Sequence, residues 1–271
     1  MRASERAAHY ASRFPLVEME ATYRFPPTPA VAQQWVDRTP EGFCIDVQCW
    51  SLLTGQPTIP GSLWEDLVPE VRPDRRDRQR LYATHLSDAG LTEAWARFVH
   101  ALAPLAESGR LGAVVLRFPR WFGPRPENEG ALADARLHLG DLPVAIELCD
   151  PAWTDPSRCD RTFDLFEDLR LAFVCVDAAP NDPRGLGGAT GTTTDLAVLR
   201  MRGRRSPDVP EEERWNPDRR AYRYDERETA EVASRVRRLA EGASDVHVLV
   251  STCWRDDAVR NAAALQDALT R

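Results

Sequence analysis

The sequence contains no lysine, so all 35 of its basic residues are arginines. This absence excludes reactions that depend on a lysine, such as those of phosphate-loop kinases, Schiff-base aldolases and pyridoxal-phosphate enzymes. Long apolar runs are also absent, since none approaches the roughly 18 residues that a membrane-spanning helix needs. The first ten residues lack the apolar core of a secretory signal. We therefore expect no membrane partner.

Cysteine pairs of the CxxC type are missing as well. The six cysteines stand apart from one another, and an even number does not by itself indicate disulfides in a chain of 271 residues. We expect reduced thiols and a cytoplasmic location. Acidic residues outnumber basic ones by 42 to 35, and a net charge of −7 argues against a general nucleic-acid binder. Five arginines do gather between residues 72 and 80, where proline and aspartate indicate a solvated loop.

Short apolar runs alternate with helical patterns along the chain. Seven runs are typical of strands: residues 16–23, 43–50, 112–118, 144–149, 172–177, 196–203 and 246–251. Helical patterns follow at residues 30–38, 92–107, 129–139, 160–169, 226–241 and 257–269. This alternation predicts an α/β fold with parallel strands joined by right-handed crossovers. No linker divides the chain, so we expect a single domain over residues 1–271.

Polar side chains alternate with apolar ones inside the strands. Parallel strands that are buried on both faces usually form unbroken apolar runs. Here one face is apolar and the other carries ionisable groups, because successive side chains of a strand point to opposite faces. A half-exposed antiparallel sheet would show the same pattern, but the intervening helices favour a TIM-type β/α barrel with polar groups inside. Such barrels build their active sites at the carboxyl ends of the strands.

The alternation predicts which ionisable side chains face the interior. They are the carboxylates of Glu18, Glu20, Asp46, Glu147 and Asp177 and the guanidinium groups of Arg117, Arg200 and Arg202. Neighbouring like charges raise the pKa of a carboxyl and nearby arginine lowers it, so this mixture could separate an acid from a base. We expect Glu147 and Asp177 to form the central catalytic pair, with Glu18 and Asp46 as further catalytic carboxylates.

Two alternatives to a purely catalytic interior stay open. The carboxylates and arginines could form a buried ion-pair network that only fills the barrel. Clustered carboxylates could also hold Mg²⁺ or Mn²⁺, although no inward histidine accompanies them and no protein ligand set for a metal is predicted.

Several segments resemble the YecE-like family, catalogued as domain of unknown function 72. The resemblance is carried by residues 17–23, 46–58, 112–122, 145–153, 195–203 and 246–265, and so covers most of the chain in order. It implies a TIM-type barrel with a polar pocket at the strand ends and brings no established reaction with it. The family pattern begins with a Gly-Trp-containing strand that is missing here. We therefore expect an incomplete barrel of seven recognisable strands, and we expect the natural start to lie upstream or another segment to cover the gap.

The resemblance also implies which polar positions belong to the pocket. Positions that match the family pattern are Glu18, Thr22, Asp46, Glu147, Trp153, Asp177, Arg255, Asp256, Arg260 and Asn261. Other positions depart from it: Gln48, Gln56, Cys149, Arg202 and Ser251-Thr252 stand where relatives carry Lys, His, Arg, His and Asn-Asn. The acidic members are kept while many nitrogen-bearing ones are replaced. The candidate substrate-binding residues are Arg117, Arg200, Arg202, Gln48, Trp153, Arg255 and Asn261.

Two functions are compatible with these residues. The first is an enzyme that uses carboxylate acid–base chemistry on a small polar or anionic metabolite, in the manner of a hydrolase, lyase or isomerase, with the arginines binding an anionic group. The second is a catalytically inactive relative that keeps the scaffold and binds a ligand or a protein. The replaced rim residues motivate the second.

Overall fold

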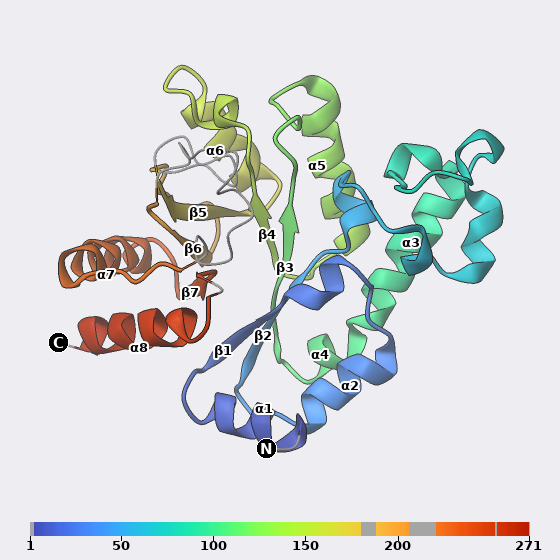
Figure 1. Cartoon of the computed structure of the whole chain (residues 1–271). Helices are drawn as coiled ribbons and strands as arrows, with labels where there is room; N and C mark the ends of the chain where they lie inside the picture. Colours follow the sequence, from blue (N-terminus) through green and yellow to red (C-terminus); the bar gives the residue numbers. More distant parts are fainter. Residues whose placement is uncertain (1–2, 180–187, 206–220, 253, 271) are drawn as a thin grey trace. The chain divides into compact units, whose positions relative to one another are not determined.

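The computed structural model describes residues 3–179, 188–205, 221–252 and 254–270 (Figure 1). Cys253 and parts of the two long connections after residues 178 and 204 lie outside the described residues. Seven strands form one sheet in the order of the sequence. They are β1 (Leu16–Met19), β2 (Cys44–Gln48), β3 (Leu111–Arg117), β4 (Val144–Glu147), β5 (Ala172–Ala178), β6 (Leu196–Gly203) and β7 (Asp245–Val250).

Helices follow the strands as the α/β pattern predicts. They are α1 (Ala3–Ala11), α2 (Pro29–Asp37), α3 (Asp88–Ala101), α4 (Ala103–Glu107), α5 (Pro126–Leu139), α6 (Cys159–Asp168), α7 (Glu226–Ala240) and α8 (Asp257–Thr270). Local sequence sets several of their starts. The Thr28 hydroxyl accepts a hydrogen bond from the Val31 N–H ahead of Pro29 at the start of α2, which satisfies one of the free donors of a helix N-terminus.

The chain divides into two compact units. Unit 1 consists of Met1–Pro119 and Pro126–Ala145, and unit 2 of Arg120–Arg125 and Ile146–Arg271. In unit 1, β1 pairs with β2 and β2 with β3, all parallel. There α2 packs against α4, and α3 packs against α5. A shift of register between Ile45 and Asp46 interrupts the β2–β3 ladder.

In unit 2, β5 pairs with β6 and β6 with β7, again in parallel. Helix α6 packs on β5, and α7 packs on α8, which runs beside it (Figure 1). Helix α7 begins with a reciprocal cap: the Asp225 side chain accepts from the Glu228 N–H, and the Glu228 side chain accepts from the Asp225 N–H. This arrangement satisfies two backbone donors at once.

Two elements differ from the sequence prediction. The first strand ends at Met19 rather than at residue 23, and residues Glu20–Tyr23 form a 3₁₀ helix. The single helix expected over residues 92–107 begins at Asp88 and is divided at Leu102 into α3 and α4. Pro104 explains the division, because proline lacks the N–H that a continuous helix would use and fits the first turn of a new one.

Among the described helices, none is both long enough and apolar enough to cross a membrane.

Candidate functional site

Glu147, the last residue of β4, lies in unit 2 between two arginines of β6. The Arg200 Nε lies 2.6 Å from Glu147 Oε2, and the Arg202 Nη2 donates to Glu147 Oε1. Glu147 is 0% exposed and Arg200 is 1% exposed, whereas Arg202 keeps 10% of its side chain exposed. The two arginines alternate with apolar Met201 on β6, as expected for side chains on one face of a strand. The structure thus brings together three of the predicted site residues.

The cluster sits at the carboxyl ends of its strands. Glu147 is the last residue of β4, and Arg202 is the last but one of β6. The Arg200 Nη1 donates a 3.0 Å hydrogen bond to Ser251 Oγ, directly after β7. In β/α folds this end of the strands carries the reactive groups, because the βα loops converge there.

Asp177 belongs to a second cluster, on the opposite face of β5 and β6. In the strand register Asp177 is the partner of Met201, so the side chains of Asp177 and Arg200 point to opposite faces of the sheet. Asp177 is 3% exposed, and its carboxylate accepts from Arg235 of α7, with 2.9 Å between Nη1 and Oδ1. The expectation that Asp177 and Glu147 share the inner face is therefore wrong. The expectation fails because β5 is buried on both faces, so its apolar residues do not show which face is the inner one.

Arg204 completes the Asp177 cluster from the end of β6. Its Nε and Nη2 each donate to one oxygen of the Asp177 carboxylate at 3.0 Å, a two-pronged arrangement typical of arginine. Its Nη1 donates to Glu231 of α7. The hydrogen bond to Asp177 is the main cause that raises the pKa of Arg204 above its usual value.

Gly203 explains why Arg204 leaves the face of Arg200 and Arg202. Its φ of +83° is a left-handed conformation that few residues with a side chain adopt. A Cβ at this position would also lie 2.6 Å from Tyr222 Cγ. The glycine thus breaks the alternation of β6 and sends the next arginine toward α7.

Two tyrosines close over this strand end. The Tyr224 hydroxyl donates to Asp177 Oδ2 at 2.8 Å and accepts from the Gly203 N–H at 3.0 Å. Burial raises the pKa of Tyr224, and the charge of Asp177 adds to the effect. The Tyr222 hydroxyl donates to Glu228 Oε1 at 2.6 Å. Burial, followed by this hydrogen bond, raises the pKa of Tyr222 to about 12.

Asn261 of α8 holds the backbone of these tyrosines. Its Oδ1 accepts from the Tyr224 N–H at 3.1 Å, and its Nδ2 donates to the Tyr222 carbonyl at 2.8 Å and to Thr252 Oγ1 at 2.9 Å. Both of its N–H groups are used inside unit 2, which favours a positioning role over direct contact with a substrate. Arg255, by contrast, is exposed and lies over the Trp254 ring, 5.3 Å from its centre.

Trp153 is a core residue in this structure. It is 0% exposed, its indole N–H donates to the Phe122 carbonyl at 2.6 Å, and its ring stacks on Phe122 with 6.0 Å between the ring centres. No face of the ring is left for a ligand, so this placement does not support the expected substrate contact. It fits the alternative that the tryptophan caps the core.

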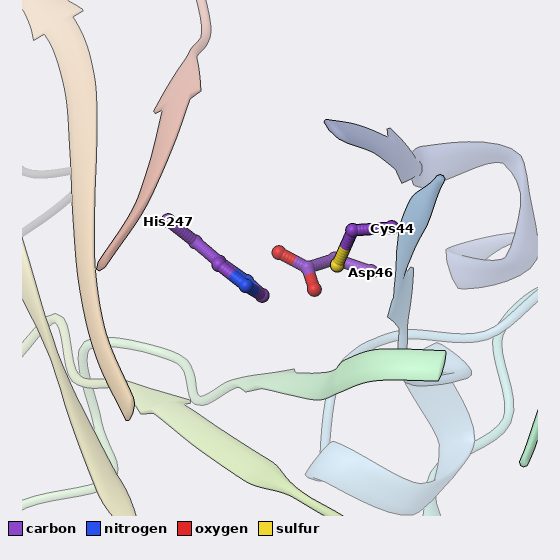
Figure 2. A group of neighbouring side chains, drawn as sticks. All are labelled: Cys44, Asp46 and His247. Carbon is purple, nitrogen blue, oxygen red and sulfur yellow. The ribbon is translucent and has the colours of Figure 1, made fainter. Parts of the chain in front are cut away.

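In unit 1, two predicted carboxylates stand side by side. Glu18 of β1 and Asp46 of β2 are register partners in the parallel pair, which places their side chains on one face. Asp46 is 0% exposed. Cys44 extends from β2 to the same side as Asp46 (Figure 2), two residues earlier on the strand. Glu20 does not join them, because it begins the 3₁₀ helix and is exposed; the expectation that it faces inward is wrong.

The other two predicted residues of unit 1 lie at strand ends. Gln48 ends β2, is 8% exposed, and its carbonyl accepts from the Thr22 hydroxyl at 2.6 Å. Arg117 ends β3, and its carbonyl accepts from Gln56 Nε2 at 3.1 Å. Gln56, which stands where the family pattern has histidine, therefore holds the end of β3.

Sequence reasoning missed the partners of Asp177. Arg204 carried a signal, since it continues the alternating arginines of β6 beyond a glycine. Arg235 carried none, because its position on α7 does not differ from that of the exposed arginines around it. Tyr224 lies beyond a long connection, so its contact with Asp177 follows only from the tertiary structure.

Comparisons with known proteins agree with the resemblance. A family model described as "Protein of unknown function DUF72" matches residues 1–271. The chain is 24% identical over 266 residues to the UPF0759 protein YunF of Bacillus subtilis (strain 168), which covers 96% of this chain and 85% of YunF.

Solved structures show the same fold. A crystal structure of a DUF72 family protein from Enterococcus faecalis V583 superposes with a TM-score of 0.81 and 26% identity, over 98% of this chain and 88% of that one. One from Thermotoga maritima MSB8 gives a TM-score of 0.73 and 22% identity, over 100% and 91%. The prediction of a TIM-type α/β barrel fold is confirmed.

Proposed function

The chain belongs to the DUF72 family of proteins of unknown function, and we propose that it binds a small anionic metabolite at the Glu147–Arg200–Arg202 cluster and performs acid–base chemistry on it. The observation that carries the proposal is a buried carboxylate held between two guanidinium groups at the carboxyl ends of the strands. Arginine forks match carboxylate and phosphate groups, so a substrate with either group fits the site.

Arg202 is the first contact for such a substrate. The Arg202 side chain is 10% exposed, whereas those of Arg200 and Glu147 are 2% and 0% exposed. Arg200 is also fixed by Ser251, so it serves as the rigid side of the cluster. A substrate anion that displaces Glu147 from Arg202 would free one carboxylate oxygen while Arg200 still holds the other.

Glu147 is the proton acceptor in this proposal. Two neighbouring guanidinium groups favour its ionised form, and a freed carboxylate oxygen within reach of a substrate proton is a general base. The reaction class is therefore that of a lyase, isomerase or hydrolase. Glu18 and Asp46 stay candidates for further acid–base residues, and the placement of Asp177 favours a positioning role instead.

A second candidate function is a non-catalytic scaffold that binds a ligand or a protein. It is favoured by the ion pairs of both Glu147 and Asp177, because such pairs also occur in networks that only specify packing. Mg²⁺ or Mn²⁺ binding stays a prediction. At Glu147 the paired guanidinium groups suit an anion better than a cation.

A panel of carboxylated and phosphorylated metabolites tests the proposal by ligand-induced thermal shift and by turnover. We expect stabilisation of the wild-type protein by at least one class of anion and loss of that stabilisation in Arg202→Gln. Turnover should fall by about 10²–10⁴-fold in Glu147→Gln. Glu167→Gln and Arg227→Gln, which change exposed residues of α6 and α7, are the matched controls.

Circular dichroism establishes that each variant is folded. Turnover that is unchanged in Glu147→Gln contradicts the catalytic proposal, and anion binding that is unchanged in Arg202→Gln contradicts the binding site. If compounds of the panel bind but none of them is turned over, this result supports the scaffold function instead.

We also propose that the protein works in the cytoplasm. Cys49, Cys159 and Cys175 are free thiols, which is usual in a reducing compartment. Cell fractionation tests the location, and recovery of the protein outside the cytoplasm would contradict it.

A further inference from the structure

The densest positive charge in unit 1 lies on the connection between β2 and α3. Residues 72–80, here called the arginine loop, contain Arg72, Arg75, Arg76, Arg78 and Arg80 and only two acidic residues, Asp74 and Asp77. The chain as a whole carries a net charge of −7. The loop is thus a local reversal of charge, within a connection whose length is itself typical of functional loops.

Backbone contacts hold the arginine loop in a defined shape. Isolated antiparallel bridges join Val71 to Leu86 and Thr58 to Leu81 on either side of it. The Arg72 N–H donates to the His85 carbonyl at 2.9 Å. Arg76 is exposed but bonds back to the chain, since its Nε donates to the Val71 carbonyl at 3.0 Å and its Nη2 to the Pro69 carbonyl at 2.9 Å. A surface ordered in this way loses little conformational entropy when a partner binds.

Three of its arginines are available to a partner. Arg75 pairs with Asp74, with 3.0 Å between Nε and Oδ2. Arg72, Arg78 and Arg80 are exposed, and none of the three forms an ion pair with any residue in the described part of the chain. Exposed arginines without an ion pair also occur elsewhere in the described part of unit 1, as at Arg13, Arg24 and Arg38. What sets the arginine loop apart is that three of them lie within nine residues.

The charges of the arginine loop act on the side chain of His85. Burial, and then the charges of Arg75, Arg72 and Arg78, lower the pKa of His85 below its usual value. The His85 ring also meets the Tyr82 ring edge to face, with 5.3 Å between the ring centres. The charges of these three arginines thus act on a residue of the aromatic pair.

We propose that the arginine loop is a docking surface for a short acidic segment of a partner protein. Guanidinium forks bind carboxylates with two parallel hydrogen bonds, which a flexible acidic segment can supply. Nucleic acid fits less well, because binding to it depends on neutralising many phosphates at once and the loop offers three arginines without an ion pair among the described residues.

Fluorescence anisotropy with a labelled peptide of about ten glutamates tests the proposal on the full-length protein, at low ionic strength. We expect binding that weakens roughly tenfold in the triple variant Arg72→Gln, Arg78→Gln, Arg80→Gln, since each exposed ion pair contributes modestly. The matched control is Arg13→Gln, Arg24→Gln, Arg38→Gln, which removes the same charge from exposed positions of unit 1 outside the loop. This control should bind as the wild type does.

Three outcomes would overturn the proposal. One is a peptide affinity that falls equally in the loop variant and in the control, because only net charge would then matter. Another is the absence of peptide binding by the wild-type protein at low salt. The third is tighter, loop-dependent binding of single-stranded DNA of equal charge, which would assign the loop to nucleic acid.

Discussion

Arg202 and Arg204 are two residues apart on one strand end, yet they pair with different carboxylates on opposite faces of the sheet. Arg202 contacts Glu147, and Arg204 contacts Asp177. The end of β6 is therefore held from both sides. We infer that the Asp177 cluster is a positioning device and that the Glu147 cluster is the candidate site, and the two can be separated by substitution.

Asp177→Asn should destabilise the protein without abolishing the response to anions. Removing the charge leaves Arg204 and Arg235 beside a neutral amide, and loss of one partner from a buried ion pair costs about 3 kcal/mol in the free energy of unfolding. Urea denaturation measures the loss. Asp168→Asn, at an exposed position of α6, should change stability by less than about 0.5 kcal/mol. Equal stability of Asp177→Asn and wild type would refute the positioning role.

Gly203→Ala should lower the free energy of unfolding by at least about 2 kcal/mol. A left-handed conformation at a residue with a side chain costs about 1–3 kcal/mol, and the added Cβ would meet the Tyr222 ring, which overpacks the contact. Gly42→Ala is the control, because Gly42 has a φ of +77° and open space around its Cβ position. Thermal and urea denaturation should show the smaller loss in the control. Equal losses would mean that the Tyr222 contact contributes nothing.

Deprotonation of Tyr222 should lower the free energy of unfolding at alkaline pH. Its folded-state pKa of about 12 lies above the usual tyrosine value of 10.0, so the folded state favours the protonated phenol. This contribution is complete below about pH 10 and is lost as the pH rises toward 12. Between about pH 10 and pH 12 the free energy of unfolding should therefore fall more steeply for wild type than for Tyr222→Phe. Parallel curves would rule out the linkage.

Asn261→Ala should loosen the segment that carries Tyr222 and Tyr224. The substitution removes three hydrogen bonds, of which two hold the backbone of that segment, and each is worth about 1 kcal/mol. Hydrogen exchange monitored by mass spectrometry should show faster exchange in peptides covering residues 221–225. Gln266→Ala, at an exposed position of the same helix, should exchange as the wild type does there. Unchanged exchange in Asn261→Ala would contradict the assignment.

The strand positions could be predicted from the sequence because each strand is a short apolar run that alternates with helical patterns along the chain. The end of the first strand was the exception. Its alternation continues through Glu20 and Thr22, but the Thr22 hydroxyl donates to the Met19 and Gln48 carbonyls at 2.6 Å each and turns the chain into a 3₁₀ helix. A side-chain hydrogen bond that competes with the ladder is not visible in a hydropathy pattern.

The candidate site was predicted in part. Glu147, Arg200 and Arg202 follow from alternation, because each lies within a strand whose neighbours are apolar. Asp177 does not, because a charged residue can also be satisfied on the helix-facing side when a helix supplies an arginine, here Arg235. Trp153 was judged from its place after a strand, and only packing against Phe122 shows that it is buried.

Glu228 serves two elements with one carboxylate. One oxygen accepts from the Asp225 N–H and initiates α7, and the other accepts from the Tyr222 hydroxyl. A phenolate at position 222 would face that carboxylate with like charge and lose its donor. Deprotonation in the connecting segment would thus be felt as fraying at the first turn of the helix, so strong base should unwind α7 from its amino end.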